Sequence, residues 1–471
     1  MKRPGHNLIS YEMLPVIFAL AWPTMLEQLM QTAVQYVDTA MVGVLGTQAT
    51  AAVGATTTLT WLITGVLAAL GIGFLTFIAR NLGAEDYDAA RRVAAQSVCA
   101  VLVSGVLFTV LILALTPLIP VLMQVDPDIR TLAATYFFIL YIPTLPRAAT
   151  IIFGTVLRAA GDTKTPMLVG LAVNLINVVL NFLLIYPTRT VTVLSCDILL
   201  PGAGWGVAGA AAASAIAITI GGIAITMVLW RHPLLSPRGM KLSPDREILR
   251  PCLQVAFPNM LQRFATSMGY VAFASMINAL GEVAAAAHTI ANTVESAFYI
   301  PGYGMQTAAS TLAGNAVGTR DKQRMRDLTA TILVIEALLM VVSGALLFLF
   351  APNMMALFSD HDEVIALGSI VLRMVAVSEP FFGISIIAEG ILYGVGDTVR
   401  PFVYNVAGMW GVRIVGTFLC TCVLGMGLVS AWACMILHNL ILSAMFILYC
   451  IRGKDSPLNP AWSSPNPTRQ E

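Results

Sequence analysis

The chain has 471 residues, of which 58% are hydrophobic and only 11% charged, and its mean hydropathy is +0.81. Soluble proteins are about 25% charged, so this composition predicts an integral membrane protein. The formal net charge of +1 offers no basic surface for nucleic acid, and the seven scattered cysteines lack the spacing of a metal site. No nucleophile motif or soluble catalytic domain is visible either, which argues against an enzyme.

Apolar stretches long enough to cross a bilayer, about 20 residues each, recur along the whole chain. Twelve are predicted, near residues 15–44, 52–79, 93–120, 131–157, 166–187, 205–230, 252–280, 285–314, 328–350, 364–393, 401–424 and 427–451. The fold class is therefore an all-α integral membrane protein. The segment 453–471 is rich in Pro, Ser and Asn, and we expect it to be a disordered tail.

The first stretch is apolar but carries a set of polar side chains. These are Thr24, Glu27, Gln28, Gln31, Gln35 and Asp38. At 100° per residue they fall within one arc of a helix, about 100° wide. A carboxylate that faces hydrocarbon costs about 2.5–3.5 kcal/mol even on insertion scales, so this stripe is predicted to face water or the bundle interior.

Lysine and arginine indicate the orientation of the chain. With the N-terminus inside, the cytoplasmic segments hold 20 of these residues and the outer loops hold 2, Arg130 and Arg189. Positive residues concentrate on the cytoplasmic side of membrane proteins. We expect a multi-pass protein of the cytoplasmic (inner) membrane with both termini in the cytoplasm.

The sequence contains an internal repeat with an offset of 235 residues. The offset aligns Pro23 with Pro258 and Gly83 with Gly318, and it aligns the Gly-Asp-Thr turns at 161–163 and 396–398. After the fifth stretch the first half carries about fourteen extra residues, around 187–201. Such a repeat predicts two six-helix lobes of parallel topology, at 1–235 and 236–452, followed by the tail at 453–471.

Several motifs together resemble the MATE (multidrug and toxic compound extrusion) family. They are Pro23, the run Tyr36–Gly43, Leu45-Gly46, the run Leu157–Thr163 with its copy Tyr393–Thr398, and Ala313-Gly314-Asn315-x-x-Gly318. The resemblance covers nearly the whole chain. It implies a V-shaped pair of six-helix lobes and cation-driven antiport of drugs by alternating access.

The resemblance also implies a cation-coupling site in the first lobe. Asp38 matches the helix 1 carboxylate, Asn177 and Asn181 match a pair on helix 5, and Ala210 and Ser214 match helix 6. One carboxylate with amide and hydroxyl oxygens suits H⁺ or a hard cation such as Na⁺. The DinF-type branch has Asp at the position of Asn181, so a two-carboxylate proton site is not implied. The alternative role for Asp38 is that of a fixed partner for a helix 5 amide.

The second lobe departs from the NorM-type branch, because its two acidic positions are Thr266 and Phe382 here. We hypothesise that Glu295 and Glu389 replace them. The alternative is that these two glutamates pair with Arg263 or Arg413. The predicted substrate-cavity residues of both lobes are Glu27, Gln31, Gln35, Tyr36, Glu295, Tyr299, Gln306 and Glu389.

Three other acidic residues are assigned simpler roles. Asp162 and Asp397 lie in Gly-Asp-Thr turns, where the side chain can hold its own backbone, so both are interpreted as turn formers. Glu379, next to Pro380, is expected closer to the outer surface.

The expected function is that of a secondary antiporter that exports amphipathic organic cations and drugs in exchange for H⁺ or Na⁺, with no other cofactor. We expect it to act as a monomer among membrane lipids. The alternative within the same superfamily is a flippase of lipid-linked saccharides. A flippase should line its cavity with arginines to meet pyrophosphate, whereas the predicted cavity here is acidic and amide-rich.

Overall fold

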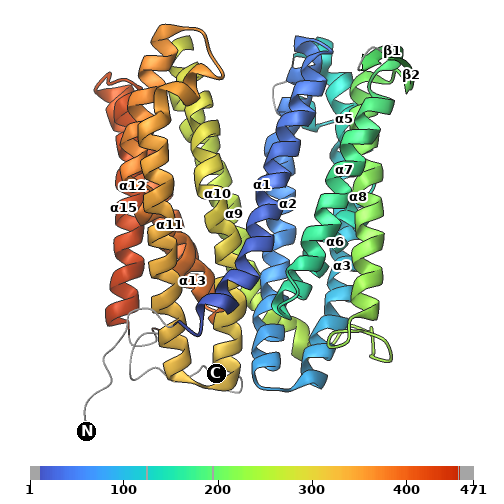
Figure 1. Cartoon of the computed structure of the whole chain (residues 1–471), viewed down its shortest axis with the longest axis vertical. Helices are drawn as coiled ribbons and strands as arrows, with labels where there is room; N and C mark the ends of the chain where they lie inside the picture. The colour runs from blue at the N-terminus through green and yellow to red at the C-terminus, as the bar shows by residue number, and fades with distance from the viewer. Residues whose placement is uncertain (1–10, 123–125, 194–195, 454–455, 457–471) are drawn as a thin grey trace. The chain divides into compact units, whose positions relative to one another are not determined.

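The computed structural model describes residues 11–122, 126–193, 196–453 and 456 (Figure 1). In the first half, these residues form helices and one hairpin: α1 (Leu14–Gly43), α2 (Thr47–Gly83), α3 (Tyr87–Leu115), α4 (Ile119–Leu122), η1 (Pro127–Ile129), α5 (Arg130–Tyr141), α6 (Thr144–Ala159), α7 (Lys164–Leu184), β1 (Pro187–Val193), β2 (Cys196–Ala203) and α8 (Gly206–Arg231). Apart from Gly453 and Ser456, the predicted tail lies outside the described residues.

In the described part of the second half, every element of regular secondary structure is a helix. Its elements are α9 (Arg246–Asn278), α10 (Glu282–Thr319), α11 (Lys322–Ala356), α12 (Asp362–Val395), α13 (Val399–Val406), η2 (Ala407–Ile414), α14 (Val415–Phe418), η3 (Leu419–Val423) and α15 (Leu428–Arg452). Two of these segments, η2 and η3, are π-helical.

Each of the twelve predicted spans corresponds, within the described residues, to one helix or to consecutive helical segments. By length and apolar composition, eight helices in this part of the chain could cross a membrane, or nine if one bent pair counts as a single span. α1, α9 and α10 are also long, but they do not meet that apolar criterion. The prediction of a helical, multi-pass membrane protein is confirmed.

Two predicted spans are interrupted. The span at 131–157 consists of η1–α5 and α6, which are bent by 53° relative to each other. Pro143 lies at the bend with non-helical dihedral angles (φ −86°, ψ 43°), and it has no N–H to continue the helix. The span at 401–424 changes from α- to π-helix at Ala407. Because π turns are rare in helices, the sequence pattern did not predict this change.

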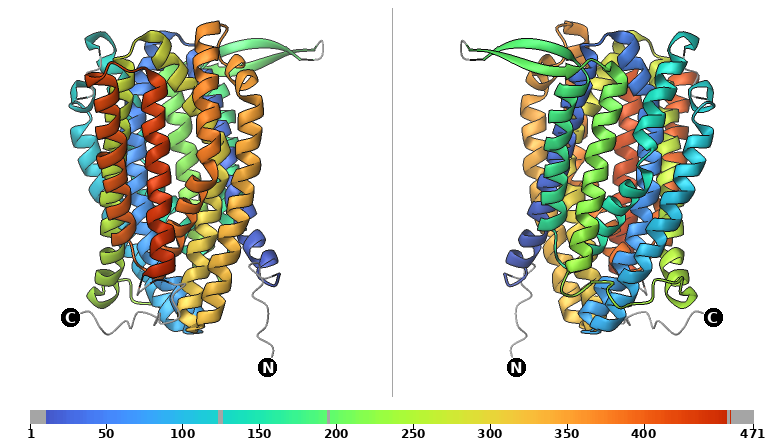
Figure 2. Two further views of the ribbon diagram at one scale, coloured as in Figure 1. Left: turned by 90° about the vertical axis from the view of Figure 1, so that its left-hand side faces the viewer. Right: turned by 90° about the vertical axis from the view of Figure 1, so that its right-hand side faces the viewer.

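The extra residues of the first half form an antiparallel hairpin, which corrects the purely helical prediction at this point. β1 and β2 pair from Pro187 with Ala203 to Val193 with Cys196, and an irregularity lies between Pro187 and Arg189. Figure 2 shows the hairpin as a long ribbon that projects from the ends of α7 and α8. The sequence Thr190–Val193 alternates Thr and Val, which is typical of a strand.

By their contacts, the described residues form two compact units. Unit 1 contains the chain up to Gln28, the segment Leu75–Tyr87 and the chain from Pro251 onward. Unit 2 contains Leu29–Phe74 and Asp88–Arg250. The start of α1 and the end of α2 therefore pack with helices from the second half. The lobe boundary at residue 235, which is drawn from the repeat, stays a prediction.

The end of α2 crosses α10 within unit 1, and the crossing is symmetric in sequence. A Cβ atom on Gly83 would lie 2.2 Å from the carbonyl oxygen of Asn315, and one on Gly318 would lie 2.0 Å from that of Arg80. The 235-residue repeat relates Gly83 to Gly318. It also relates Arg80 to Asn315, the two residues whose carbonyl oxygens lie against these glycines. The two backbones can approach this closely only because neither position has a side chain.

Both helices carry a small residue one turn earlier. Ala79 precedes Gly83 by four residues, and Gly314 precedes Gly318 by four. A Cβ on Gly314 would lie 2.7 Å from the Cβ of Ala79. Small residues at this spacing allow close helix packing in membranes, where the hydrophobic effect gives helices little reason to associate.

Hydrogen bonds extend the contact of α2 to α12. The Thr76 hydroxyl donates to the carbonyl oxygen of Tyr393 at 2.7 Å, and the Arg80 guanidinium donates to that of Val395 at 2.9 Å. At the start of α1, the Thr24 hydroxyl donates to the carbonyl oxygen of Gly304 at 2.9 Å. Polar side chains of the first half thus bind backbone carbonyls of the second half.

We predict that Gly318→Ala lowers the free energy of unfolding by about 1–3 kcal/mol, because the added methyl group would enter space held by a backbone carbonyl. The matched control is Gly54→Ala in α2, where nothing lies within 4 Å of the added Cβ. The control is expected to gain about 0.5–1 kcal/mol from helix propensity. Thermal unfolding in detergent measures both variants, and equal midpoints would contradict the tight crossing.

Candidate functional site

The residues predicted around Asp38 come together in unit 2 from three helices. Asp38 lies on α1, Asn177 and Asn181 lie one turn apart on α7, and Ala210 and Ser214 lie one turn apart on α8. A spacing of four residues places each pair on one face of its helix. Both asparagines are buried, whereas Asp38 and Ser214 are half-buried.

Amide groups hold the Asp38 carboxylate. The Asn181 amide nitrogen donates to Asp38 Oδ1 at 2.6 Å. With its amide nitrogen turned toward α1, Asn177 donates to Oδ1 and Oδ2 of Asp38 at 2.9 and 3.1 Å. In that orientation the Asn177 oxygen accepts a hydrogen bond from the Ser214 hydroxyl at 2.9 Å. Two neutral amides thus stabilise a negative charge.

The opposite orientation of the Asn177 amide suits a protonated Asp38. The amide oxygen then lies 2.9 Å from Asp38 Oδ1, where it can accept the carboxyl proton. The amide nitrogen donates to the Ser214 hydroxyl at 2.9 Å, and the oxygen also accepts from Asn181 at 3.3 Å. Because an amide exchanges donor and acceptor on rotation, the site can hold both protonation states of the carboxyl group.

No basic side chain neutralises Asp38. Within the described residues, no lysine or arginine lies within ion-pair distance of its carboxylate. Arg147, which lies on α6, instead donates to the carbonyl oxygen of Leu140 at 3.3 Å and sits over the Tyr141 ring, 4.8 Å from its centroid. In the described part of the chain, Asp38 therefore has no fixed cationic partner.

The Asp38 site also offers an unused oxygen ligand. Asn181 Oδ1 is buried and accepts no hydrogen bond. A buried acceptor without a donor is costly, and a cation would satisfy it. In the part of the chain that the structure describes, no group of three or more His, Cys, Asp or Glu could hold a metal ion. The oxygen atoms that this site offers are therefore those of Asp38, Asn181 and Ser214.

The predicted stripe on α1 is divided between the two units. Glu27 belongs to unit 1 and is half-buried, whereas Gln31, Gln35 and Tyr36 belong to unit 2 and are exposed. The Tyr36 ring is 42% exposed. Gln31, Gln35 and Tyr36 are thus accessible, as expected of a polar face.

Glu389 lies in a dense hydrogen-bond network in unit 1. Gln262 of α9 donates to Glu389 Oε1, and the Tyr393 hydroxyl donates to the same oxygen at 2.5 Å. Gln306 of α10 donates to Oε2 at 3.1 Å, and Asn405 of α13 donates to Oε1 at 3.3 Å. Four donors from four helices hold this carboxylate, which can remain charged without a cation.

Glu295 has a different environment, although it shares a helical face of α10 with Gln306. Glu295 is buried, and one turn along the helix lies Tyr299. The Tyr299 ring contacts Phe382 edge-on at 5.4 Å between centroids. Phe382 stands where the NorM-type branch has an acid, so an aromatic contact occupies that position here. Gln306 donates to Glu389, whereas no hydrogen bond joins Glu295 to either residue in the described structure.

The two arginines that were possible partners of these glutamates make their direct contacts with other residues. Arg263 donates to the Asn259 side chain at 3.0 Å. Arg413 lies over the rings of Tyr270 and Phe273, each 5.4 Å from its centroid. Among the described residues, no ion pair joins Glu295 or Glu389 to an arginine.

Asp162 and Asp397 both bind nearby backbone. Asp162 accepts from the Thr165 amide at 3.0 Å, and Asp397 accepts from the Arg400 amide at 3.3 Å. Asp397 also forms an ion pair with the Arg400 guanidinium. The predicted turn-forming role of both residues is confirmed.

Sequence reasoning missed Glu336 on α11, which is fully buried. It is the only acidic residue between Leu328 and Phe350, and a lone carboxyl group in so apolar a segment was the signal that could have found it. Glu379 is buried among helices, with 1% of its surface exposed. Its expected place closer to the outer surface of the membrane stays a prediction.

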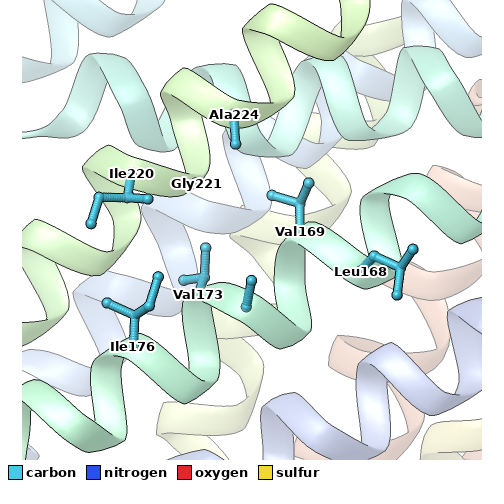
Figure 3. A pocket seen from close by; sticks show the side chains of 8 residues that line it. Leu168, Val169, Val173, Ile176, Ile220, Gly221 and Ala224 are labelled. Atoms are coloured by element: carbon cyan, nitrogen blue, oxygen red, sulfur yellow. The ribbon is translucent and has the colours of Figure 1, made fainter.

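An apolar groove of about 200 Å³ lies between α7 and α8 in unit 2. Figure 3 shows Val169 and Val173 of α7 pointing toward Gly221 and Ala224 of α8, and Leu168 lies at the edge of the groove. No polar side chain lines this groove, so it cannot bind a cation and plays no part in the site.

We predict that Tyr393→Phe lowers the free energy of unfolding by about 1–3 kcal/mol, since Glu389 loses a charge-assisted hydrogen bond. Tyr404→Phe is the matched control, because its ring packs on Phe446 and its hydroxyl makes no hydrogen bond in the described structure. The control should stay within about 0.5 kcal/mol of the wild type. Chemical or thermal unfolding separates the two, and an unaffected Tyr393→Phe variant would argue against the network.

Comparison of the sequence with known protein families gives a match over most of the chain. The MatE family model matches residues 23–183 and matches again at 258–419, so the two matches begin with the offset of the internal repeat. The probable multidrug resistance protein NorM of Thermotoga maritima is 27% identical over 456 residues, which cover 95% of each chain. The probable NorM of Neisseria meningitidis serogroup A is 25% identical over 447 residues, 93% of each chain.

Solved structures share the fold. A MATE protein in complex with MaL6 superposes with a TM-score of 0.86 at 23% identity, over 95% of this chain and 98% of that one. A MOP superfamily transporter from Pyrococcus furiosus, reported with a binding pocket of reverse polarity, gives 0.84 at 23% identity, over 95% and 97%. The resemblance inferred from the motifs is confirmed, and the chain belongs to the MatE family of membrane transporters.

Proposed function

We propose that this chain is a secondary antiporter that exports amphipathic organic cations, including drugs, in exchange for H⁺. The observation that carries the proposal is the Asp38 carboxylate, which is held by two amides and has no basic partner among the described residues. The names of the NorM relatives, which are probable multidrug resistance proteins, support drugs as the substrate class.

Exchange follows from competition for one negative charge. Charged Asp38 attracts an organic cation, and protonation removes that attraction. The two orientations of the Asn177 amide stabilise the two protonation states in turn. One charge that crosses a potential of 100 mV supplies about 2.3 kcal/mol, enough for a substantial substrate gradient.

Na⁺ is the alternative coupling ion. Asp38, the free Oδ1 of Asn181 and the Ser214 hydroxyl offer it oxygen ligands. We favour H⁺, because a protonated Asp38 can donate to the Asn177 oxygen once that amide rotates, whereas Na⁺ would have to displace the amide donors from the carboxylate.

Substrate recognition is assigned to the polar face of α1 and to aromatic side chains. Gln31, Gln35 and Tyr36 are exposed on α1. A Tyr ring can stack on a flat organic cation, and amides can bind its polar groups. Glu27, Glu295, Tyr299, Gln306 and Glu389 remain proposed cavity residues of unit 1.

The topology is part of the same proposal. We place the protein in the cytoplasmic membrane with both termini inside, supported by the 20 Lys and Arg residues assigned to that side against 2 on the other. The protein is proposed to act as a monomer, and its lipid contacts follow from its apolar helices.

We predict that Asp38→Asn reduces efflux driven by ΔpH at least about tenfold, because the variant can neither bind nor release the coupling proton. Efflux of a fluorescent organic cation from proteoliposomes is measured under a pH gradient and, separately, under a Na⁺ gradient. Asp362→Asn, at the exposed start of α12, is the control and should behave like the wild type.

The outcomes separate the candidate functions. If transport by the wild type responds only to the Na⁺ gradient, Na⁺ and not H⁺ is the coupling ion. Flux that ignores both gradients would overturn the antiporter proposal itself. Wild-type coupling in Asp38→Asn would remove Asp38 from the mechanism.

A further inference from the structure

Unit 1 contains two buried carboxyl groups without any hydrogen-bond partner. Glu336 of α11 is 0% exposed and Glu379 of α12 is 1% exposed. Neither oxygen of Glu336 and neither oxygen of Glu379 has a partner in the described structure. Buried polar groups almost always have partners in native proteins, so two such carboxyl groups on adjacent helices require an explanation.

Two glycines make the space for the Glu336 carboxyl group. A Cβ on Gly302 of α10 would lie 2.7 Å from Glu336 Oε1, and one on Gly383 of α12 would lie 3.2 Å from the same oxygen. The carboxyl group therefore points between α10 and α12. The Gly302 position is also close to the ends of the Met340 and Ile386 side chains, at 2.8 and 3.5 Å, so the surroundings are apolar.

The contrast with Glu389 indicates the charge state. Glu389, on α12 as well, accepts hydrogen bonds from Gln262, Tyr393, Gln306 and Asn405. An ionised Glu336 would have none of these donors, and an uncompensated buried charge is strongly unfavourable. Glu336 and Glu379 are therefore stable in this conformation only as neutral acids.

Other ionisable groups lie near this pair. From α10, Glu295 and Tyr299 face Glu379, and Glu336 faces it from α11. The positive charge of Arg413, on η2, attracts the carboxyl group of Glu295 electrostatically. Like-charged carboxylates at short range cannot all ionise cheaply, which again favours bound protons.

Three ionisable side chains lie along one face of α10 beside the pair. Glu295, Tyr299 and Tyr303 follow one another at four-residue intervals on one face of α10. The rings of Tyr299 and Tyr303 are in edge contact, 6.0 Å between centroids, and Tyr303 is 36% exposed. One face of α10 therefore carries ionisable hydroxyl and carboxyl groups from the partly exposed Tyr303 to the buried Glu295.

We propose that Glu336, together with Glu379, is a proton-binding site in unit 1, distinct from the Asp38 site, that takes up and releases H⁺ during transport. Binding forms a carboxyl O–H bond and involves no electron transfer. The ligand is a proton because the described residues offer no metal-binding group of three or more His, Cys, Asp or Glu, and the surroundings of Glu336 are apolar. The link to transport rests on the proposed H⁺-coupled antiport.

The first test is the pH dependence of stability, which needs no transport. Thermal unfolding of the purified full chain is followed from acid to alkaline pH. The wild type should lose stability as the pH rises, because deprotonation would leave a bare buried carboxylate. Glu336→Gln keeps the size and neutrality of the acid, so this loss should shrink. Glu363→Gln, at the exposed start of α12, should retain the wild-type profile.

The second test is coupling in proteoliposomes. Glu336→Gln should bind a fluorescent organic cation as the wild type does, but its accumulation driven by ΔpH should fall about tenfold and fewer protons should move per substrate. If Glu336→Gln does not fold, Glu379→Gln is measured in the same two assays with the same expectation. Wild-type coupling and a wild-type stability profile in the variant would make Glu336 a permanently neutral packing group and overturn the inference.

The two proposals fail separately. Unchanged Glu336→Gln beside an inactive Asp38→Asn would overturn only the unit 1 site. Wild-type transport driven by Na⁺ alone would overturn H⁺ coupling, and the stability profile would still decide whether Glu336 binds a proton.

Discussion

Removal of a carboxyl group from water is the constraint on which the arrangement of this protein depends. The described residues surround their buried carboxyl groups in three different ways. At Asp38, the Asn181 and Asn177 amides donate to the carboxylate, and rotation of the Asn177 amide replaces its donor nitrogen with an acceptor oxygen. At Glu389, four donors from different helices fix the charge. At Glu336, glycines make room for the group and no donor is supplied. Among the described residues, two amides therefore serve Asp38, four donors serve Glu389 and none serves Glu336.

Much of the fold was predictable, because hydropathy and helix length depend on local sequence. All twelve spans correspond to helical segments, and the repeat appears again in the two family-model matches. The bend at Pro143 and the π-helix from Ala407 were not predicted, since hydropathy does not report backbone geometry. The hairpin was seen only as extra residues, although its Thr-Val alternation is a strand signal.

The candidate site was predictable only in part. The residues of the Asp38 site were found through the family resemblance, and the three helices bring them together. On α10, helical periodicity placed Glu295 and Gln306 on one face but could not say that Gln306 would bind Glu389 while Glu295 would not. Which neighbours a face meets is decided by tertiary packing. Glu336 escaped notice because its segment otherwise has the composition of an ordinary span.

The crossing of α2 and α10 has a consequence for the origin of the chain. Gly83 meets the carbonyl of Asn315 and Gly318 meets that of Arg80, so the same surface occurs on both sides of the contact. A surface that fits its own copy is what a symmetric homodimer requires. A half-length ancestral protein could therefore have paired with an identical molecule through this crossing before gene fusion joined the two copies.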